Sequence, residues 1–104
     1  MTVDFQALKR TTLNKVSDDK VFWVVRGDRI DNAADLANCI ESLTSEQFHH
    51  HVNEEGKRND FAVWIHDVLH NPLLARDLDF PVHLRDQKHY AKTIKDHIAW
   101  LQTL

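Results

Sequence analysis

The segment from Asn59 to His70 carries the clearest helical pattern of the chain. Its large apolar residues recur at positions i, i+3, i+4, i+7 and i+8, the spacing that places side chains on one face of an α-helix. They are Phe61, Trp64, Ile65, Val68 and Leu69. Asn59 can cap the first turn, and Asp60 lies where the helix dipole favours negative charge. The pattern predicts a helix whose apolar stripe other elements must cover.

The segments on both sides of this helix also show helical spacing. Apolar residues there predict further helices near residues 3–16, 32–43, 45–55, 72–78 and 84–103. Thr44 followed by Gln47 is a capping-box pattern, and either Asp31 or Asn32 can cap the helix before it. Asn71-Pro72 ends one helix and begins the next, because proline is tolerated at a first helical position.

One stretch favours β-structure. Residues Val21–Arg26 are β-branched and aromatic, and Gly27-Asp28 after them is typical of a turn. We expect this stretch to pair with a short strand around Arg29–Ile30, with Phe22 or Trp23 facing the helices, since two strands alone are marginal in water. The 104 residues suit one domain. We therefore predict a mainly α fold over residues 1–104, a compact bundle of five to six helices with a minor two-stranded ribbon.

The charge, the cysteine content and the apolar runs of the chain limit which partners and which cellular compartment we expect. The net charge of −3 gives no support to a polyanionic partner, and a nucleic-acid surface at Lys9, Arg10 and Lys15 is the weakest of the alternatives. The lone Cys39 forms no internal disulfide and fits a reducing compartment. The first residues lack the apolar run of a signal peptide, and no run is long enough to span a membrane. We expect a cytoplasmic protein.

Five of the eight histidines lie between Phe48 and His70. His66 and His70 are four residues apart, so both could bind one ion, and with His50 they form the candidate site for zinc, iron or nickel. Both lie at the flank of the apolar stripe, however, and no HExxH glutamate separates them. We favour no metal and no cofactor, and we expect His51 to be partly buried, with a hydrogen bond to a backbone carbonyl or to Asn53.

No catalytic constellation stands out. The adjacent Glu54-Glu55 pair has no apolar pocket to shift its pKa values, and nothing near Cys39 could act as its base. The two glycines lie far apart, so the chain has no glycine-rich phosphate loop. The sequence predicts a protein that is not an enzyme.

One set of short motifs can be compared with a known family. It comprises Phe48, His51-Val52-Asn53, Asn59-Asp60-Phe61, Trp64-Ile65, Val68-Leu69 and Leu74-Ala75. The set resembles a family of small, uncharacterised prokaryotic helical domains that share an F-x-x-H-V-N … N-D-F-x-x-W-I pattern, and the likeness extends over about residues 20–78. Members commonly end the tryptophan helix with Gly-Asp, where this chain has His70-Asn71.

The resemblance implies a helical fold and no established activity. Physically, the motif can fix two helices against each other, and we interpret it as architectural. Its structural residues are Phe48, His51, Asn53, Asn59, Asp60, Phe61 and Trp64.

The remaining hypothesis is a non-enzymatic accessory module that binds another protein, with a second copy of the chain as the other candidate partner. An apolar patch with a polar rim is the usual mark of a contact surface. We predict that the patch lies on the C-terminal helix and that a polar edge lies beside it. The candidate residues are His50, Glu54, Arg58, His66, Ile98 and Trp100.

Overall fold

The computed structural model describes residues 4–52, 58–78 and 87–104. Its helices are α1 (Phe5–Leu13), α2 (Ala33–Ser42), α3 (Ser45–His51), α4 (Asp60–Asp67), α5 (Pro72–Asp77) and α6 (Gln87–Gln102), with a 3-10 turn η1 (Asp18–Lys20). The strands are β1 (Phe22–Trp23) and β2 (Arg29–Ile30), which pair antiparallel. These elements confirm the predicted mainly helical fold with a small two-stranded sheet.

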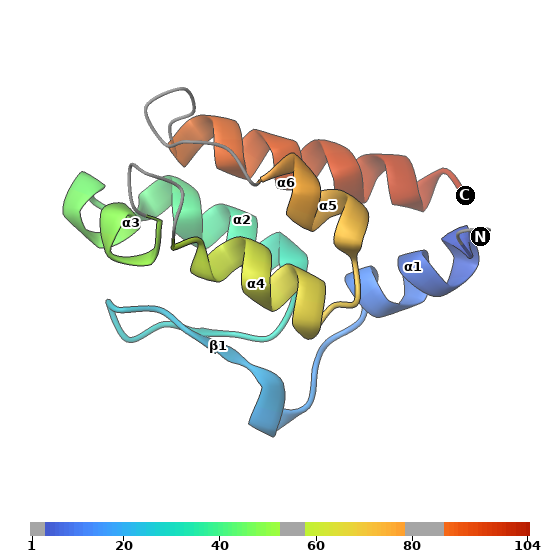
Figure 1. The fold of residues 1–104 in the computed structure, drawn as a ribbon, viewed down its shortest axis with the longest axis horizontal. Helices are drawn as coiled ribbons and strands as arrows, with labels where there is room; N and C mark the ends of the chain where they lie inside the picture. Colours follow the sequence, from blue (N-terminus) through green and yellow to red (C-terminus); the bar gives the residue numbers. More distant parts are fainter. Residues whose placement is uncertain (1–3, 53–57, 79–86) are drawn as a thin grey trace.

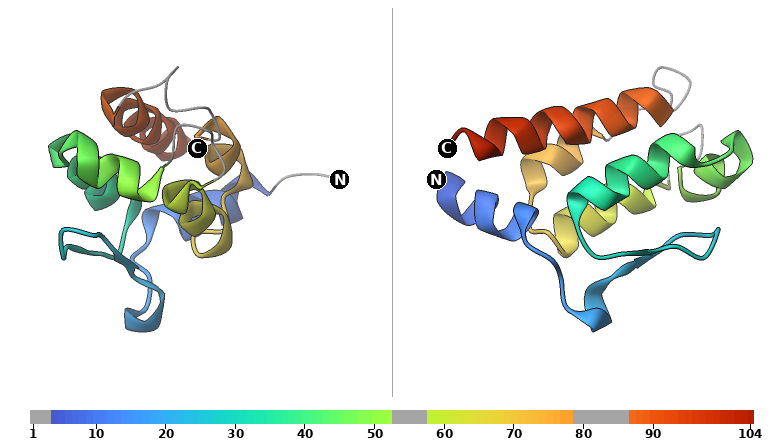
Figure 2. Two further views of the ribbon diagram at one scale, coloured as in Figure 1. Left: turned by 60° about the vertical axis from the view of Figure 1, so that its left-hand side comes forward. Right: turned by 180° about the vertical axis from the view of Figure 1, so that it is seen from behind.

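The helices form layers around a shared core. Helices α2 and α6 pack along each other, while α4 and α5 lie in front of them in Figure 1. The ribbon lies on the side of the molecule away from α6, as both views of Figure 2 confirm. The start of α1 and the end of α6 meet at one end of the long axis, where the Lys9 ammonium donates a hydrogen bond of 2.9 Å to the carbonyl of Leu104.

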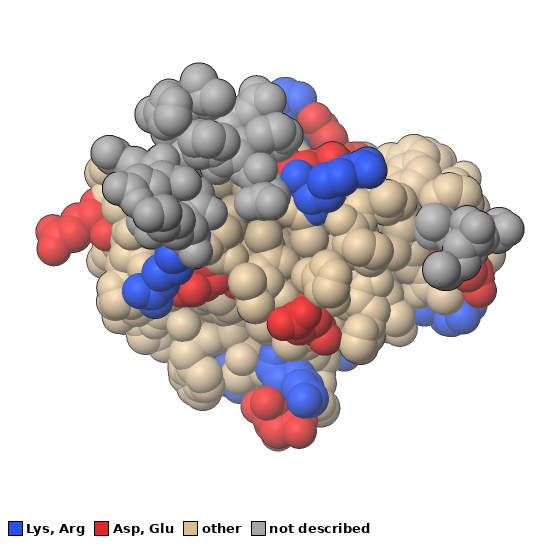
Figure 3. Space-filling view, viewed as in Figure 1, with Lys and Arg blue, Asp and Glu red and all other residues tan. Residues whose placement is uncertain are grey.

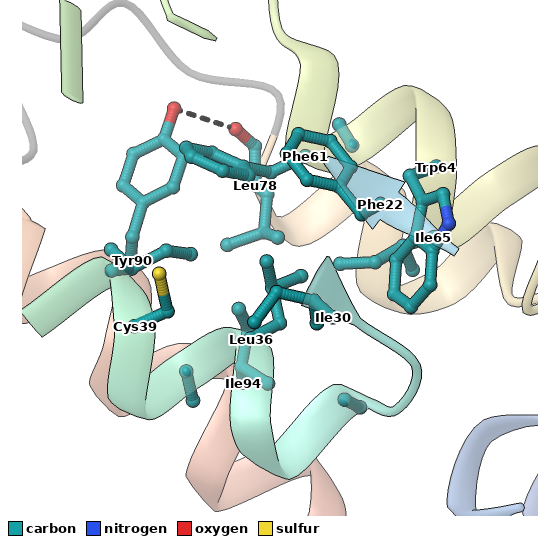
Figure 4. Packing of buried hydrophobic residues seen from close by; sticks show 14 of the residues in the cluster. Phe22, Ile30, Leu36, Cys39, Phe61, Trp64, Ile65, Leu78, Tyr90 and Ile94 are labelled. Carbon is teal, nitrogen blue, oxygen red and sulfur yellow. Dashed lines mark hydrogen bonds between the residues drawn. The ribbon is translucent and has the colours of Figure 1, made fainter. Parts of the chain in front are cut away.

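Aromatic rings from four elements fill the centre of the core. The Phe61 ring stacks on Phe48 at a centroid distance of 6.1 Å and contacts Phe22 at 5.4 Å, and the Tyr90 ring meets Phe48 edge-on at 5.2 Å. Figure 4 shows Phe22, Phe61 and Tyr90 facing the aliphatic residues of α2 and α6, including Leu36. Burying these rings adds to the apolar stabilisation that the surrounding aliphatic side chains supply.

The ribbon is shorter than predicted. Phe22 pairs with Ile30 and is buried, whereas Trp23 points away from the core and is 64% exposed. The chain leaves the ladder after two residues because a turn begins at Val24, whose carbonyl accepts a hydrogen bond of 2.7 Å from the amide of Gly27. Gly27 has a φ of +108°, a conformation that favours glycine.

The N-terminal helix is also shorter than the predicted 3–16. Asp4 caps it, because its carboxylate accepts a hydrogen bond from the amide of Ala7, and the helix ends at Leu13. Val16 therefore lies in the following connection, where its amide donates to the carbonyl of Asp31. In the described ranges, no helix combines the length and apolar character that crossing a membrane requires.

Candidate functional site

His51 is a buried hydrogen-bonding centre. The Thr44–Gln47 capping box starts α3, and His51 is the last residue of that helix. Its Nε2 accepts a hydrogen bond of 3.0 Å from the amide of Val25, so the ring proton lies on Nδ1. Nδ1 lies 2.9 Å from Asp60 Oδ2 and donates to it. The imidazole thus joins the ribbon, α3 and α4 in a neutral, fixed tautomer.

This arrangement corrects the predicted partners of His51. The acceptor at Nδ1 is the carboxylate of Asp60 and not a backbone carbonyl, and the alternative acceptor Asn53 lies outside the described residues. The imidazole ring also packs between Phe22 and Phe61, each at a centroid distance of 5.2 Å. Because both ring nitrogens are engaged inside the core, His51 has no free lone pair for a substrate or a metal.

Asp60 carries the charge of this cluster. Burial opposes ionisation of its carboxyl, but hydrogen bonds from Arg58 and His51 outweigh that effect and lower the pKa of Asp60. The Arg58 guanidinium donates to Oδ2 at 3.0 Å. Asp60 is also the first residue of α4, where the helix dipole favours an anion. The group is therefore a stable anion that anchors the start of the helix.

Asn59 links α4 to α5 and α6. Its Oδ1 caps α4 by accepting a hydrogen bond of 3.0 Å from the amide of Ala62. Its Nδ2 donates to the carbonyl of Leu78 at 2.8 Å and to the hydroxyl of Tyr90 at 3.3 Å. The Tyr90 hydroxyl donates to the same carbonyl, which is the dashed line in Figure 4. Trp64 also ties α4 to the rest of the fold, because its Nε1 donates a hydrogen bond of 2.8 Å to the carbonyl of Lys20.

The motif residues described by the structure are therefore placed in one packed cluster. Phe48 and Phe61 stack, Asn59 caps α4, and Trp64 ties that helix to η1. Each of these contacts joins elements of the fold. This placement agrees with an architectural interpretation of the motif.

The alternative metal set is not brought together. His66 Nδ1 lies 2.8 Å from the carboxylate of its neighbour Asp67, on the exposed side of α4. His70 follows the helix and His50 lies on α3, both exposed. Within residues 4–52, 58–78 and 87–104, no three His, Cys, Asp or Glu side chains lie close enough to hold one metal ion.

Cys39 is buried beside an ion pair. The Arg26 guanidinium donates to Asp28 at 2.8 Å and to Ser42 at 2.9 Å, and the Cys39 sulfur lies 3.6 Å from that guanidinium. Burial and the Asp28 carboxylate raise the pKa of the Cys39 thiol despite Arg26. A protonated thiol is a weak nucleophile, so this site lacks the character of a catalytic cysteine.

The predicted contact residues do not form one surface. His50 belongs to α3 and Trp100 to the last turn of α6, and these elements lie at opposite ends of the long axis in Figures 1 and 2. Ile98 is half-buried against the core, and Arg58 is engaged with Asp60. Glu54 lies outside the described residues. The polar edge and the apolar part of the predicted surface are thus separate.

A different apolar surface surrounds Trp100. The Trp100 ring, 39% exposed, meets the 45% exposed ring of Phe5 edge-on at a centroid distance of 5.7 Å, and Leu104 is also exposed. We call Phe5, Trp100 and Leu104 the terminal patch. The sequence did not identify Phe5 as a contact residue, because its helical spacing is that of a core residue. In the structure it is exposed at the end of the molecule where α1 meets α6.

A groove of about 450 Å³ adjoins the terminal patch between α5 and α6. Its lining combines Trp100 with neutral, basic and acidic side chains. These are Leu73, Arg76, Asp77, Thr93, Asp96 and His97. Burial lowers the pKa of His97, although Asp77 acts in the opposite direction. An aromatic wall with charges of both signs can bind an amphipathic ligand.

Comparison with known proteins gives no relative. No protein-family model, no curated protein and no solved structure matches the chain. The resemblance to small prokaryotic helical domains therefore stays a prediction from the motif.

Proposed function

We propose that this protein is a non-enzymatic, cytoplasmic binding module that holds an amphipathic segment of another protein. The contact surface is the terminal patch together with the α5–α6 groove. The observation that carries the proposal is the edge-to-face pair of Phe5 and Trp100, two large aromatic side chains left exposed side by side. Exposed apolar residues that lie together with a polar rim mark contact sites, whereas single ones are ordinary.

The patch is held in place before binding. The ring of Phe5 supports one side of Trp100, and the ring of His97 lies at 5.3 Å on another. The hydrogen bond from the Lys9 ammonium to the carbonyl of Leu104 also joins α1 to the residues that follow α6. A partner therefore loses little free energy to ordering of this surface, and tryptophan is enriched among residues that dominate binding energy.

The groove supplies the polar half of the contact. Arg76 makes no ion pair in the described part of the chain, while Asp96 accepts a hydrogen bond of 2.6 Å from Lys92. A bound segment can place an apolar side chain on Trp100 and polar groups along the groove. The exposed Trp23 is a less suitable centre, because no ring contact joins it to another exposed apolar side chain among the described residues.

Site-specific photo-crosslinking tests the proposal. A photoreactive amino acid replaces Trp100 in one version and Trp23 in another, and each is expressed in native cytosol. We expect a discrete adduct with one protein from position 100 and none from position 23. The purified partner should then bind the wild-type chain, and Phe5→Ala with Trp100→Ala should weaken that binding by at least about tenfold.

Trp23→Ala is the matched control, because it removes a tryptophan that is even more exposed. Circular dichroism of all variants checks that they remain folded. Equal binding by the patch variant and the wild type would exclude this surface. Size-exclusion chromatography with light scattering measures whether the protein forms a dimer. If the wild type and Trp23→Ala are dimers and the patch variant is a monomer, the partner at this surface is a second copy of the chain and not another protein.

A further inference from the structure

A second pocket lies at the other end of α1, away from the terminal patch. It has a volume of about 350 Å³ and is formed by the last turns of α1, the connection to η1, and the end of α4. Four of its side chains are basic, and no carboxylate lines it. We call the cluster of Arg10, Lys15, Lys20 and His70 the basic pocket.

Among the described residues, no carboxylate forms an ion pair with the lysine and arginine side chains of the basic pocket. Most other described cations are engaged with carboxylates, as the Arg26, Arg29, Arg58, Lys92 and Lys95 contacts show. Arg10, Lys15 and Lys20 make no such contact through their side chains in the described ranges. A chain of net charge −3 thus concentrates unpaired positive charge in one concave place.

The walls of the pocket are fixed to the core. The carbonyl of Lys20 accepts the Trp64 indole bond at 2.8 Å, and the amide of Val16 donates to Asp31 at 2.8 Å. Of the nearby acids, Asp18 forms an ion pair with Arg29, whereas Asp19 accepts a hydrogen bond from the Ser17 hydroxyl and also interacts electrostatically with Lys20. Because the backbone of the pocket is already fixed, less conformational entropy is lost when the lysine and arginine side chains bind a ligand.

We propose that the basic pocket binds the dianionic phosphate group of a small molecule. Lysine and arginine are the side chains that form strong, charge-assisted hydrogen bonds to phosphate, and the pocket volume lies at the lower end of small-molecule sites, which start at about 300 Å³. The site goes beyond the protein-binding surface and shares no residue with it.

An extended nucleic acid fits the surface less well. A nucleic-acid interface needs a continuous basic stripe, and on the face shown in Figure 3 the lysine and arginine side chains lie beside acidic ones. Lys9, grouped with Arg10 and Lys15 in the sequence-based nucleic-acid alternative, points instead to the carbonyl of Leu104. On that face the basic charge is therefore not continuous.

An NMR titration of the ¹⁵N-labelled protein with inorganic phosphate tests the site. Ionic strength is held constant with sodium chloride at about pH 7.5, where phosphate is mostly dianionic. We expect saturable shifts confined to amides near residues 10–20 and 68–70. Arg10→Gln with Lys15→Gln should weaken the apparent affinity by at least about tenfold, because charge-assisted contacts are lost.

Lys88→Gln with Lys92→Gln is the control, since it removes the same charge from exposed positions on α6. It should change the affinity by less than about twofold. The proposal fails if phosphate gives no saturable shifts, if acetate shifts the same amides equally, or if the control variant loses as much affinity. Saturation by an oligonucleotide but not by phosphate would assign the site to nucleic acid instead. Spectra of both variants away from the pocket establish that each remains folded.

Discussion

The side-chain amide of Asn71 donates a hydrogen bond of 2.9 Å to Nε2 of His97 and thereby joins the start of α5 to α6. The same amide donates to the Thr12 hydroxyl at 2.9 Å, and Oδ1 of Asn71 caps α5 through the amide of Leu74. Asn71 is fully buried. One side chain therefore satisfies a helix end and connects three helices.

Asn71→Ala should lower the free energy of unfolding by about 2–3 kcal/mol, because it removes a helix cap and takes a hydrogen bond from the buried Thr12 hydroxyl and from the half-buried His97 imidazole. Urea denaturation followed by circular dichroism measures the change. Asn32→Ala is the matched control: Asn32 caps α2 in the same way, but among the described residues its side-chain amide donates to nothing beyond the nearby carboxylates of Asp31 and Asp35. That variant should lose about 1 kcal/mol. Equal losses would show that the contacts of Asn71 with Thr12 and His97 add nothing.

His97 should make the stability of the folded protein depend on pH. Burial lowers the pKa of His97 against the opposing effect of Asp77, so the unfolded chain binds a proton at higher pH than the folded one. Stability should therefore fall as the pH drops below about 6.5, the unperturbed histidine value. His97→Gln should reduce the difference between unfolding free energies at about pH 7.5 and about pH 5.5.

His66→Gln is the control for this pH effect, because His66 is exposed on α4. The pH difference should shrink more in His97→Gln than in His66→Gln. A His97→Gln protein whose stability changes with pH as strongly as the wild type would mean that other groups cause the effect.

Local signals in the sequence predicted much of the fold. The Thr44–Gln47 capping box, the Asn59 cap and the Asn71-Pro72 boundary are confirmed, because each depends on residues within one helical turn. The choice left open between Asp31 and Asn32 is resolved in favour of Asn32, whose side chain accepts from the amide of Asp35.

The candidate sites were less predictable because they depend on distant contacts. His51 receives its hydrogen bond from Val25, 26 positions earlier in the chain, and no local pattern encodes that pairing. Phe5 has helical spacing, yet it is exposed because α1 meets α6 near the ends of both. Periodicity indicates which residues share a face, but packing decides whether that face is covered.

The hydrogen-bonded carboxylate of Asp60 should contribute stability that acid removes. Its pKa is lowered in the folded protein, so the contribution is complete above the unfolded value of about 3.9 and is lost as the pH falls through the folded value. Asp60→Asn should cost about 1–2 kcal/mol at neutral pH, and the difference from the wild type should shrink below about pH 4. Denaturant titrations across this range measure both effects.

Asp67→Asn serves as the comparison for Asp60, since Asp67 is an exposed carboxylate that also contacts a histidine. Its change should stay within about 0.5 kcal/mol. If both variants were equally stable, the cluster of Arg58, His51 and Asp60 would contribute no more than a surface pair.

His70 occupies a backbone position that suits glycine. Its φ of +53° lies in the left-handed region just after α4, and the next amide, that of Asn71, folds back to the carbonyl of Ile65 at 3.1 Å. A side chain with a Cβ costs about 1–2 kcal/mol in this conformation. His70→Gly should therefore raise the free energy of unfolding by about 0.5–1 kcal/mol, after the greater chain entropy of glycine is counted. His66→Gly, the same replacement inside α4, should lower it by about 1 kcal/mol. Thermal unfolding monitored by circular dichroism measures both changes, and the two melting temperatures should move in opposite directions. A loss of stability in both variants would show that the His70 side chain stabilises the helix end more than its backbone strain destabilises it.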